Sequence, residues 1–205
     1  EDIDKLKGAD VIFYHGLYLE GQMAKMFANF EGSKKHVYRI TKPIPADRLL
    51  SSEDFKGHPD PHIWFEVPLW SLCVEEVVKG LSAVDPANAA TYRKNGERVR
   101  SDMAALHEWA LKRVGELPSE KRILFTSHDA FNYFARGYKF RVEALLGIST
   151  EDKAGNADVT KMVDMIKASP VKVLFTESSV SSKGLQQIKR DAGVRIGGEL
   201  FSDAM

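Results

Sequence analysis

Cysteine is almost missing from this chain of 205 residues, and its scarcity excludes two kinds of protein. The single Cys73 cannot form an internal disulfide, and a zinc site built mainly of cysteines is ruled out. A chain with so little cysteine suits the cytosol, and it equally suits a disulfide-poor periplasmic or surface location. The cysteine content therefore leaves the compartment open.

An excess of one charge and long apolar runs are missing as well. Lys and Arg number 29 and Asp and Glu number 29, so the formal net charge is zero at pH 7. This balance argues against a nucleic-acid binder and against a polybasic membrane patch, because both need a basic excess. No stretch approaches the ~18 consecutive apolar residues of a membrane span. With 43% hydrophobic residues the chain can still bury a core, which predicts a globular protein.

The common enzyme signatures are absent too. The chain has no Gly-x-Gly-x-x-Gly, no phosphate-binding Gly-x-x-x-x-Gly-Lys, no Gly-x-Ser-x-Gly and no His-Glu-x-x-His. These absences argue against dinucleotide, nucleotide and serine-hydrolase chemistry, although they do not exclude an unusual enzyme.

Short β-rich segments alternate with helical ones along the chain. The predicted strands, each rich in β-branched or aromatic residues, are 9–14, 36–40, 122–126, 172–176 and 193–196. The predicted helices are about 17–30, 67–83, 130–137, 157–168 and 182–192. Such alternation favours an α/β fold with mostly parallel sheets covered by helices, in which ligand groups gather at the carboxyl ends of the strands.

Residues 88–117 form a segment of a different kind. Apolar residues recur there at three- and four-residue steps, at Val99, Met103, Leu106, Ala110, Val114 and Leu117. This spacing predicts one continuous helix, which Pro118 ends. A helix of that length is too long for one small lobe, so we expect it to join two α/β lobes, residues 1–87 and 118–205.

Two histidines lie in places that favour ligand binding. His62 belongs to Pro59-Asp60-Pro61-His62, where two prolines make a stiff turn that presents the imidazole. The alternative is a loop histidine bonded to a nearby carbonyl. His128 follows an apolar strand, at the edge where parallel sheets bind ligands. The alternative there is that Ser127 and Asp129 cap the next helix and His128 takes no part.

Asp203 is the third candidate. It follows Gly197-Gly198, which we expect to turn the chain sharply and bring Asp203 to the same sheet edge; a helix cap is the alternative. Two imidazoles and one carboxylate match the ligands that Zn²⁺, Mn²⁺ and Fe²⁺ accept. Because His62 precedes the long helix and His128 and Asp203 follow it, the ion is expected in the cleft between the lobes.

Five motifs occur together and in order along the chain. They are Asp60-Pro-His-Ile-Trp64, Asp85-Pro-Ala-Asn88, Thr126-Ser-His-Asp-Ala-Phe-Asn-Tyr-Phe134, Glu177-Ser-Ser179 and Gly197-Gly-Glu-Leu-Phe-Ser-Asp203. The set closely resembles the metal-binding receptors of bacterial zinc, manganese and iron ABC importers, the TroA-like cluster. The resemblance spans essentially all 205 residues. It implies two (β/α)4-like lobes joined by one rigid helix, with the metal ion in the interlobe cleft.

The resemblance also implies roles for single residues. His62 and His128 match the second and third metal ligands of the family, and Asp203 matches the last. The first ligand, a histidine in an Asp-Pro-His-x-Tyr-like motif, is expected upstream of Glu1. A further helix is expected after Met205, so the chain is predicted to be truncated at both ends.

Three other residues belong to the predicted site. His15 is a substitute for the first ligand within this chain, although it is not the family's usual ligand. Glu177 is expected in the second shell, bonded to a ligand imidazole or to Arg136, and a purely structural buried ion pair is the alternative.

The predicted function is that of a non-catalytic receptor. It captures a divalent transition metal (Zn²⁺, Mn²⁺ or Fe²⁺) in the periplasm, or at the cell surface as a lipoprotein, and delivers it to an ABC permease. It is expected to be a monomer that binds no nucleic acid. The alternative is a metal-dependent hydrolase that uses the same His/Asp cluster with Glu199 or Asp129 as general base. A cell adhesion role is a further possibility for a surface protein with this fold.

Overall fold

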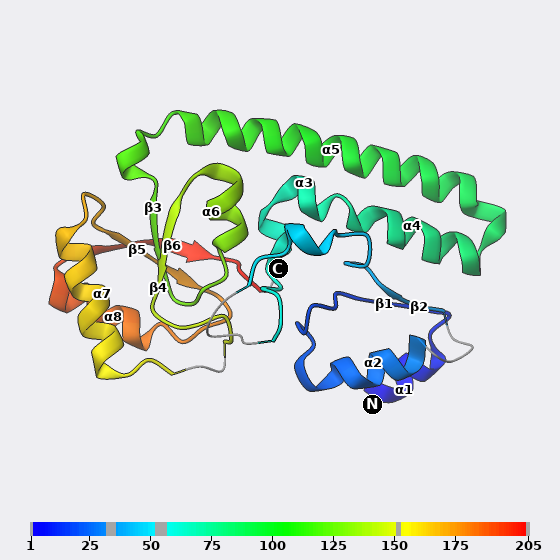
Figure 1. Cartoon of the computed structure of the whole chain (residues 1–205), viewed down its shortest axis with the longest axis horizontal. Helices are drawn as coiled ribbons and strands as arrows, with labels where there is room; N and C mark the ends of the chain where they lie inside the picture. Colours follow the sequence, from blue (N-terminus) through cyan, green and yellow to red (C-terminus); the bar gives the residue numbers. More distant parts are fainter. Residues whose placement is uncertain (1, 32–35, 52–56, 151–152, 204–205) are drawn as a thin grey trace. The chain divides into compact units, whose positions relative to one another are not determined.

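A computed structural model describes residues 2–31, 36–51, 57–150 and 153–203 (Figure 1). The chain divides into two compact units, one made of Glu1–Leu49 and His58–Trp109, the other of Leu50–Gly57 and Ala110–Met205. Helix α5 (Ala89–Gly115) begins in the first unit and ends in the second without interruption. In the described part of the chain, no helix has the length and apolar character needed to cross a membrane.

The first unit is built on a parallel pair of strands. Strand β1 (Val11–Tyr14) pairs in register with β2 (His36–Arg39). Its helices are α1 (Asp2–Gly8), α2 (Ala24–Glu31), α3 (Val67–Trp70), α4 (Cys73–Val84) and the larger part of α5. Helix α4 packs on both strands, and a Cβ at its Gly80 would lie only 2.6 Å from the Phe13 ring. The absence of a side chain at Gly80 therefore lets α4 approach the sheet closely.

The second unit holds two further parallel pairs. Strand β3 (Ile123–Thr126) pairs with β4 (Arg141–Ala144), β5 (Val173–Glu177) pairs with β6 (Arg195–Leu200), and β3 also lies against β5. The helices are α6 (Asn132–Tyr138), α7 (Asn156–Ala168) and α8 (Lys183–Ala192). Because β3, β5 and β6 belong to parallel pairs, the loops that follow them emerge on one side of this unit.

The core of the second unit lies between the strands and helices α7 and α8. Phe125 of β3 and Leu174 of β5 are fully buried against Ile166 of α7 and against Leu185 and Ile188 of α8. Each helix contributes a stripe of apolar side chains, as expected for helices that cover one face of a sheet. This packing fixes the strand ends that carry the polar side chains described below.

The predicted α/β class, the parallel strands and the long connecting helix are confirmed. Cys73 is a buried residue of α4, as its apolar neighbours suggest, and burial raises the pKa of its thiol to about 12. The predicted helix 67–83 is instead divided into α3 and α4. Ser71 lies at the division, where its hydroxyl donates to the carbonyl of Pro68 and so competes with the helix ladder.

Two other predictions were wrong in detail. The helix expected from residue 17 begins only at Ala24, after a short 3₁₀ turn, because Leu17 and Tyr18 have φ values of 54° and 70°. These left-handed conformations are incompatible with a right-handed helix. Strand β4 was not predicted, because its sequence Arg-Val-Glu-Ala alternates charged and small residues and lacks the β-branched run of the other strands.

The core packing of the second unit leads to a stability prediction. Leu174→Ala removes a fully buried side chain between β5 and the two helices, and is expected to lower the free energy of unfolding by about 2–5 kcal/mol. Leu117→Ala, in the same unit but 42% exposed, should change it by less than about 0.5 kcal/mol. Urea unfolding monitored by circular dichroism measures both. Equal losses would show that the core does not lie where the structure places it.

Candidate metal centre

The loop after β3 carries a histidine that is completely buried. Strand β3 ends at Thr126, and Ser127 and His128 follow it with almost no solvent exposure. Thr126 stabilises the loop because its hydroxyl donates to the carbonyl of His128, 3.1 Å away. Helix α6 starts only at Asn132 and has no side-chain cap, so Ser127 and Asp129 do not cap it.

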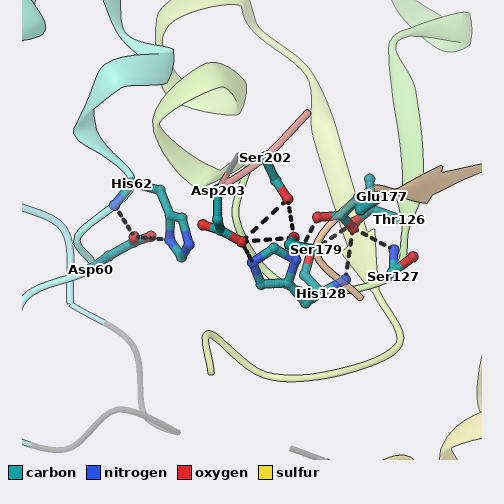
Figure 2. A network of polar contacts seen from close by, with 9 residues as sticks. All are labelled: Asp60, His62, Thr126, Ser127, His128, Glu177, Ser179, Ser202 and Asp203. Atoms are coloured by element: carbon teal, nitrogen blue, oxygen red, sulfur yellow. Dashed lines mark hydrogen bonds and ion pairs between the residues drawn. The ribbon is translucent and has the colours of Figure 1, made fainter. Parts of the chain in front are cut away.

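Glu177, the last residue of β5, contacts both the backbone and the side chain of this histidine (Figure 2). Its Oε1 accepts the backbone N–H groups of Ser127 and His128, at 2.7 and 2.9 Å. Its Oε2 lies 2.5 Å from Nδ1 of the His128 ring. One buried carboxylate therefore fixes both the backbone of the loop and the orientation of the imidazole.

Asp203 approaches the other nitrogen of the same ring. Its Oδ2 lies 3.1 Å from Nε2 of His128. The hydroxyls of Ser179 and Ser202 donate to that oxygen at 3.0 and 3.3 Å, and the two serine oxygens are themselves 3.0 Å apart (Figure 2). The loops after β5 and β6 thus position a carboxylate beside Nε2 of the buried His128.

The two carboxylates determine the charge of the His128 ring. Burial by itself lowers the pKa of His128, but hydrogen bonds and charge attraction from Asp203 and Glu177 outweigh it and raise the pKa to about 9. At neutral pH the imidazole therefore carries a proton on each nitrogen. A cation that binds Nε2 takes the place of the proton that faces Asp203.

In the first unit, His62 is held by its neighbour Asp60 (Figure 2). Oδ1 of Asp60 accepts both the backbone N–H of His62, at 2.9 Å, and the ring Nδ1–H, at 2.7 Å. Both residues are buried, and the short 3₁₀ helix Ile63–Phe65 follows directly. The rings of Trp64 and His62 meet edge to face, with centroids 5.3 Å apart.

His15, the proposed substitute for the first ligand, follows β1 and is buried. Its Nε2 lies 2.8 Å from the carbonyl oxygen of Pro61, and its ring contacts Trp64 and Trp70. Burial is the largest influence and lowers the pKa of His15 to about 4, so the ring is neutral at pH 7. Because a carbonyl only accepts, Nε2 carries the proton and bonds the backbone.

Arg136, expected near Glu177, is an exposed residue of α6. Its guanidinium lies over the Tyr133 ring, 5.0 Å from the centroid. The Tyr133 hydroxyl in turn accepts the backbone N–H of Leu50 at 2.9 Å. Of the two partners considered for Glu177, the His128 imidazole is the one that it contacts in the structure.

The glycine pair before Asp203 does not form the sharp turn that was predicted. Gly197 and Gly198 lie inside β6, where the register against β5 shifts by one residue between Leu174 and Thr176. A Cβ at Gly197 would lie 2.8 Å from the Val173 and Phe175 side chains. The glycines therefore let β6 accommodate a bulge next to bulky neighbours, and the strand continues toward Asp203.

Three residues that position the candidate ligands escaped the prediction: Asp60, Ser179 and Ser202. Each lies within a motif already noted in the sequence. For Asp60 the spacing itself was a signal, because an Asp side chain commonly accepts the N–H of the residue two positions later. The serines offered no such signal, since their contacts depend on two loops distant in sequence.

Comparison with known proteins places this chain in a family. All of residues 1–205 match the model of ZnuA, the periplasmic component A of a zinc-uptake complex. The chain belongs to the ZnuA family. This confirms the resemblance to metal-binding receptors of ABC importers that the five ordered motifs indicated.

The relatives of this ZnuA-family chain are named for different metals. It is 38% identical to the manganese-binding lipoprotein MntA of Bacillus subtilis, over the whole chain and 68% of that protein. It is 35% identical to the zinc-binding protein TroA of Treponema pallidum, again over the whole chain and over 67% of TroA. The family model is described as periplasmic, and MntA is a lipoprotein. Both descriptions are consistent with a location of this chain outside the cytoplasm.

Solved structures of similar proteins show the same fold. The periplasmic zinc-binding protein TroA of Treponema pallidum superposes with a TM-score of 0.93 at 34% identity, covering the whole chain and 74% of TroA. Fe(III)-bound YtgA of Chlamydia trachomatis gives a TM-score of 0.85 at 28% identity, covering the whole chain and 76% of YtgA.

The bulge in β6 gives a test of how Asp203 is positioned. Gly197→Ala is expected to cost about 1–3 kcal/mol of unfolding free energy, because its new methyl group meets Val173 and Phe175. Gly198→Ala is the matched control, since a Cβ there meets no atom within 4 Å, and should change stability by less than about 1 kcal/mol. Thermal denaturation compares the pair, and a Gly198→Ala loss as large as the other would disprove the bulge.

Proposed function

We propose that this chain captures a divalent transition-metal ion, Zn²⁺, Mn²⁺ or Fe²⁺, outside the cytoplasm and delivers it to the permease of an ABC importer. The observation that carries the proposal is the buried imidazole of His128, which two carboxylates hold at the strand ends of the second unit. Membership of the ZnuA family supports it, as do relatives named for manganese, zinc and iron.

We further propose that His62, His128 and Asp203 are ligands of this ion. Both imidazoles contact a carboxylate through Nδ1, and in this proposal Nε2 is the nitrogen that binds the metal. Neutral imidazole nitrogen and carboxylate oxygen form the donor set that these three metals share. The proposal takes the first ligand from a histidine that precedes Glu1, with His15 as the alternative.

The proposed role is that of a cargo-binding protein, without catalysis, acting as a monomer and without nucleic acid. The metal-dependent hydrolase would need a general base beside the ion, and Glu199 and Asp129 were the candidates. Glu199 is exposed and pairs with Thr176 in the β-ladder, and the Asp129 backbone bonds to Gly147. The named relatives support transport.

The ligand set is tested by alanine substitution. His62→Ala, His128→Ala and Asp203→Ala should each weaken binding of the preferred metal by more than the ~100-fold that loss of a second-shell group can cost. Calorimetric titration of Zn²⁺ and Mn²⁺ into protein purified without a histidine tag measures the affinities. His36→Ala, which removes an exposed histidine of β2, is the control and should bind as the parent does. A variant of the three that binds normally is not a ligand.

The receptor role is tested against the hydrolase alternative with the same preparation. Metal-loaded protein should stimulate ATP hydrolysis by the ABC permease complex that it is proposed to serve, whereas His128→Ala loaded in the same buffer should not. The metal-loaded protein should also leave phosphate and carboxylate esters unhydrolysed beyond the rate of free metal. Ester turnover that His128→Ala abolishes would favour the hydrolase instead.

A further inference from the structure

A buried hydrogen bond connects the residue after β1 to the turn that carries His62. Nε2 of His15 lies 2.8 Å from the carbonyl oxygen of Pro61, and both residues are buried. Because a carbonyl only accepts, the imidazole donates this bond. We propose that His15 is a positioning residue in metal binding: its Nε2–H fixes the Pro61 carbonyl and thereby the direction in which the next residue, His62, presents its imidazole.

This inference rests on the proposed function, because His15 can position a ligand only if His62 is one. It also gives His15 a role that differs from that of a substitute first ligand, and the two roles use different nitrogens. As a ligand, His15 would bind the ion through Nδ1, since Nε2 holds its proton toward Pro61. As a positioning residue, it needs the Nε2–H donor and no contact with the ion.

The Pro61 carbonyl is a point from which a hydrogen bond acts directly on His62. The same oxygen also accepts the backbone N–H of Ile63 at 2.8 Å. His62 therefore lies at the centre of a three-residue turn, with φ −76° and ψ 39°, close to an inverse γ-turn. A carbonyl oxygen has two lone pairs and can accept from Ile63 and His15 together. The peptide plane that leads into His62 is thus held both from within the turn and from β1.

The backbone of His15 is itself fixed on both sides. Its N–H donates to Oε1 of Glu20 at 2.7 Å, and its carbonyl accepts the hydroxyl of Thr41 at 2.7 Å. His15 directly follows β1, and Thr41 lies two residues after the end of β2, the strand that pairs with β1. The paired strands therefore determine where His15 lies, and His15 transmits that position to the turn around His62.

Two tryptophans hold the ring of His15. It stacks on Trp70, with centroids 5.7 Å apart, and meets Trp64 edge to face at 5.3 Å. The Trp64 ring also contacts the ring of His62. Turning Nε2 of His15 away from Pro61 would disturb these ring contacts as well as the hydrogen bond. Packing and hydrogen bonding therefore favour the same orientation of the imidazole.

Substitutions that keep or remove the donor test the proposal. The NH₂ group of His15→Gln is as many bonds from the backbone as Nε2 and can donate to Pro61, but an amide is not among the usual Zn²⁺ ligands. His15→Leu has no donor. It should weaken Zn²⁺ binding by roughly tenfold, the lower end of the loss expected for a group that orients a ligand. His15→Gln should stay within about threefold of the parent, because the donor is kept.

Competition with a chelating indicator measures these affinities on the whole chain. His36→Gln and His36→Leu are the matched controls, because they make the same two changes at an exposed histidine of β2. Both should bind as the parent does. Melting curves of the metal-free variants report any general loss of structure, which rescue of affinity by His15→Gln separates from loss of the donor.

A spectroscopic measurement on the parent separates the two roles of His15 without any substitution. In protein labelled with ¹⁵N-histidine, His15 should show a protonated Nε2 and an unprotonated Nδ1 both before and after Zn²⁺ is added. The Nε2 resonance of His62 should instead move when the metal binds. A Zn²⁺-induced shift of the His15 Nδ1 resonance as large as that of His62 would identify His15 as a ligand and overturn the proposal.

The affinities distinguish this inference from the function on which it rests. A parent that binds neither Zn²⁺ nor Mn²⁺ would overturn the proposed function. A parent that binds, together with a folded His15→Leu variant of equal affinity, would overturn the positioning role alone. Equal losses in His15→Leu and His15→Gln would also overturn it, because the donor would then not be what matters.

Failure of His15→Leu to fold would move the comparison to His15→Phe, whose ring can pack between the two tryptophans without offering a donor. Its affinity should fall as predicted for His15→Leu, and parent-like affinity would overturn the positioning role. A His15→Gln variant that folds but binds at least about tenfold more weakly than the parent would overturn it whichever donor-free variant folds.

Discussion

The contact between Glu177 and His128 is the interaction on which the second unit's polar centre depends. A carboxylate buried to 2% exposure is costly unless its oxygens are paired, and here each oxygen has a partner from the loop after β3. Those partners lie 49 and 50 residues away in sequence. They meet only because β3 and β5 run side by side and end together. Without that arrangement of strands, the Glu177 carboxylate would be a buried charge with no partner. The fold and the polar centre therefore stabilise each other.

The apolar core and the polar centre divide the same strands between them. Phe125 and Leu174 pack against α7 and α8, and three residues after each of them the chain supplies His128 and Glu177. Rigid packing of the core part of β3 and β5 therefore holds His128 and Glu177 in a defined geometry at the ends of the same strands. The first unit uses a more local solution, because Asp60 and His62 are two residues apart and a proline between them restricts the turn.

The sequence allowed prediction of what short-range chemistry controls. The parallel strands follow from β-branched runs, and the long helix from its three- and four-residue spacing. The three candidate ligands follow from their places after a strand or directly after a proline turn. Contacts between residues distant in sequence, and the register of strand pairs, could not be predicted from the sequence. The pairing of Ser179 with Asp203 spans 24 residues, and the bulge in β6 depends on which β5 side chains it meets. A Gly-Gly pair favours a turn and a bulge alike, and only the neighbouring Val173 and Phe175 decide between them.

The extra residue in β6 also affects how this family can change over time. Substitutions at most positions of a strand alter one side chain, but loss of one residue at Gly197-Gly198 would remove the bulge and with it the local bend and extra twist of β6. Asp203 lies only a few residues beyond, so such a deletion would change the direction in which the strand leads toward this carboxylate. The length of this strand therefore contributes to the position of Asp203. Within the family, insertions or deletions in β6 should be far rarer than amino-acid replacements.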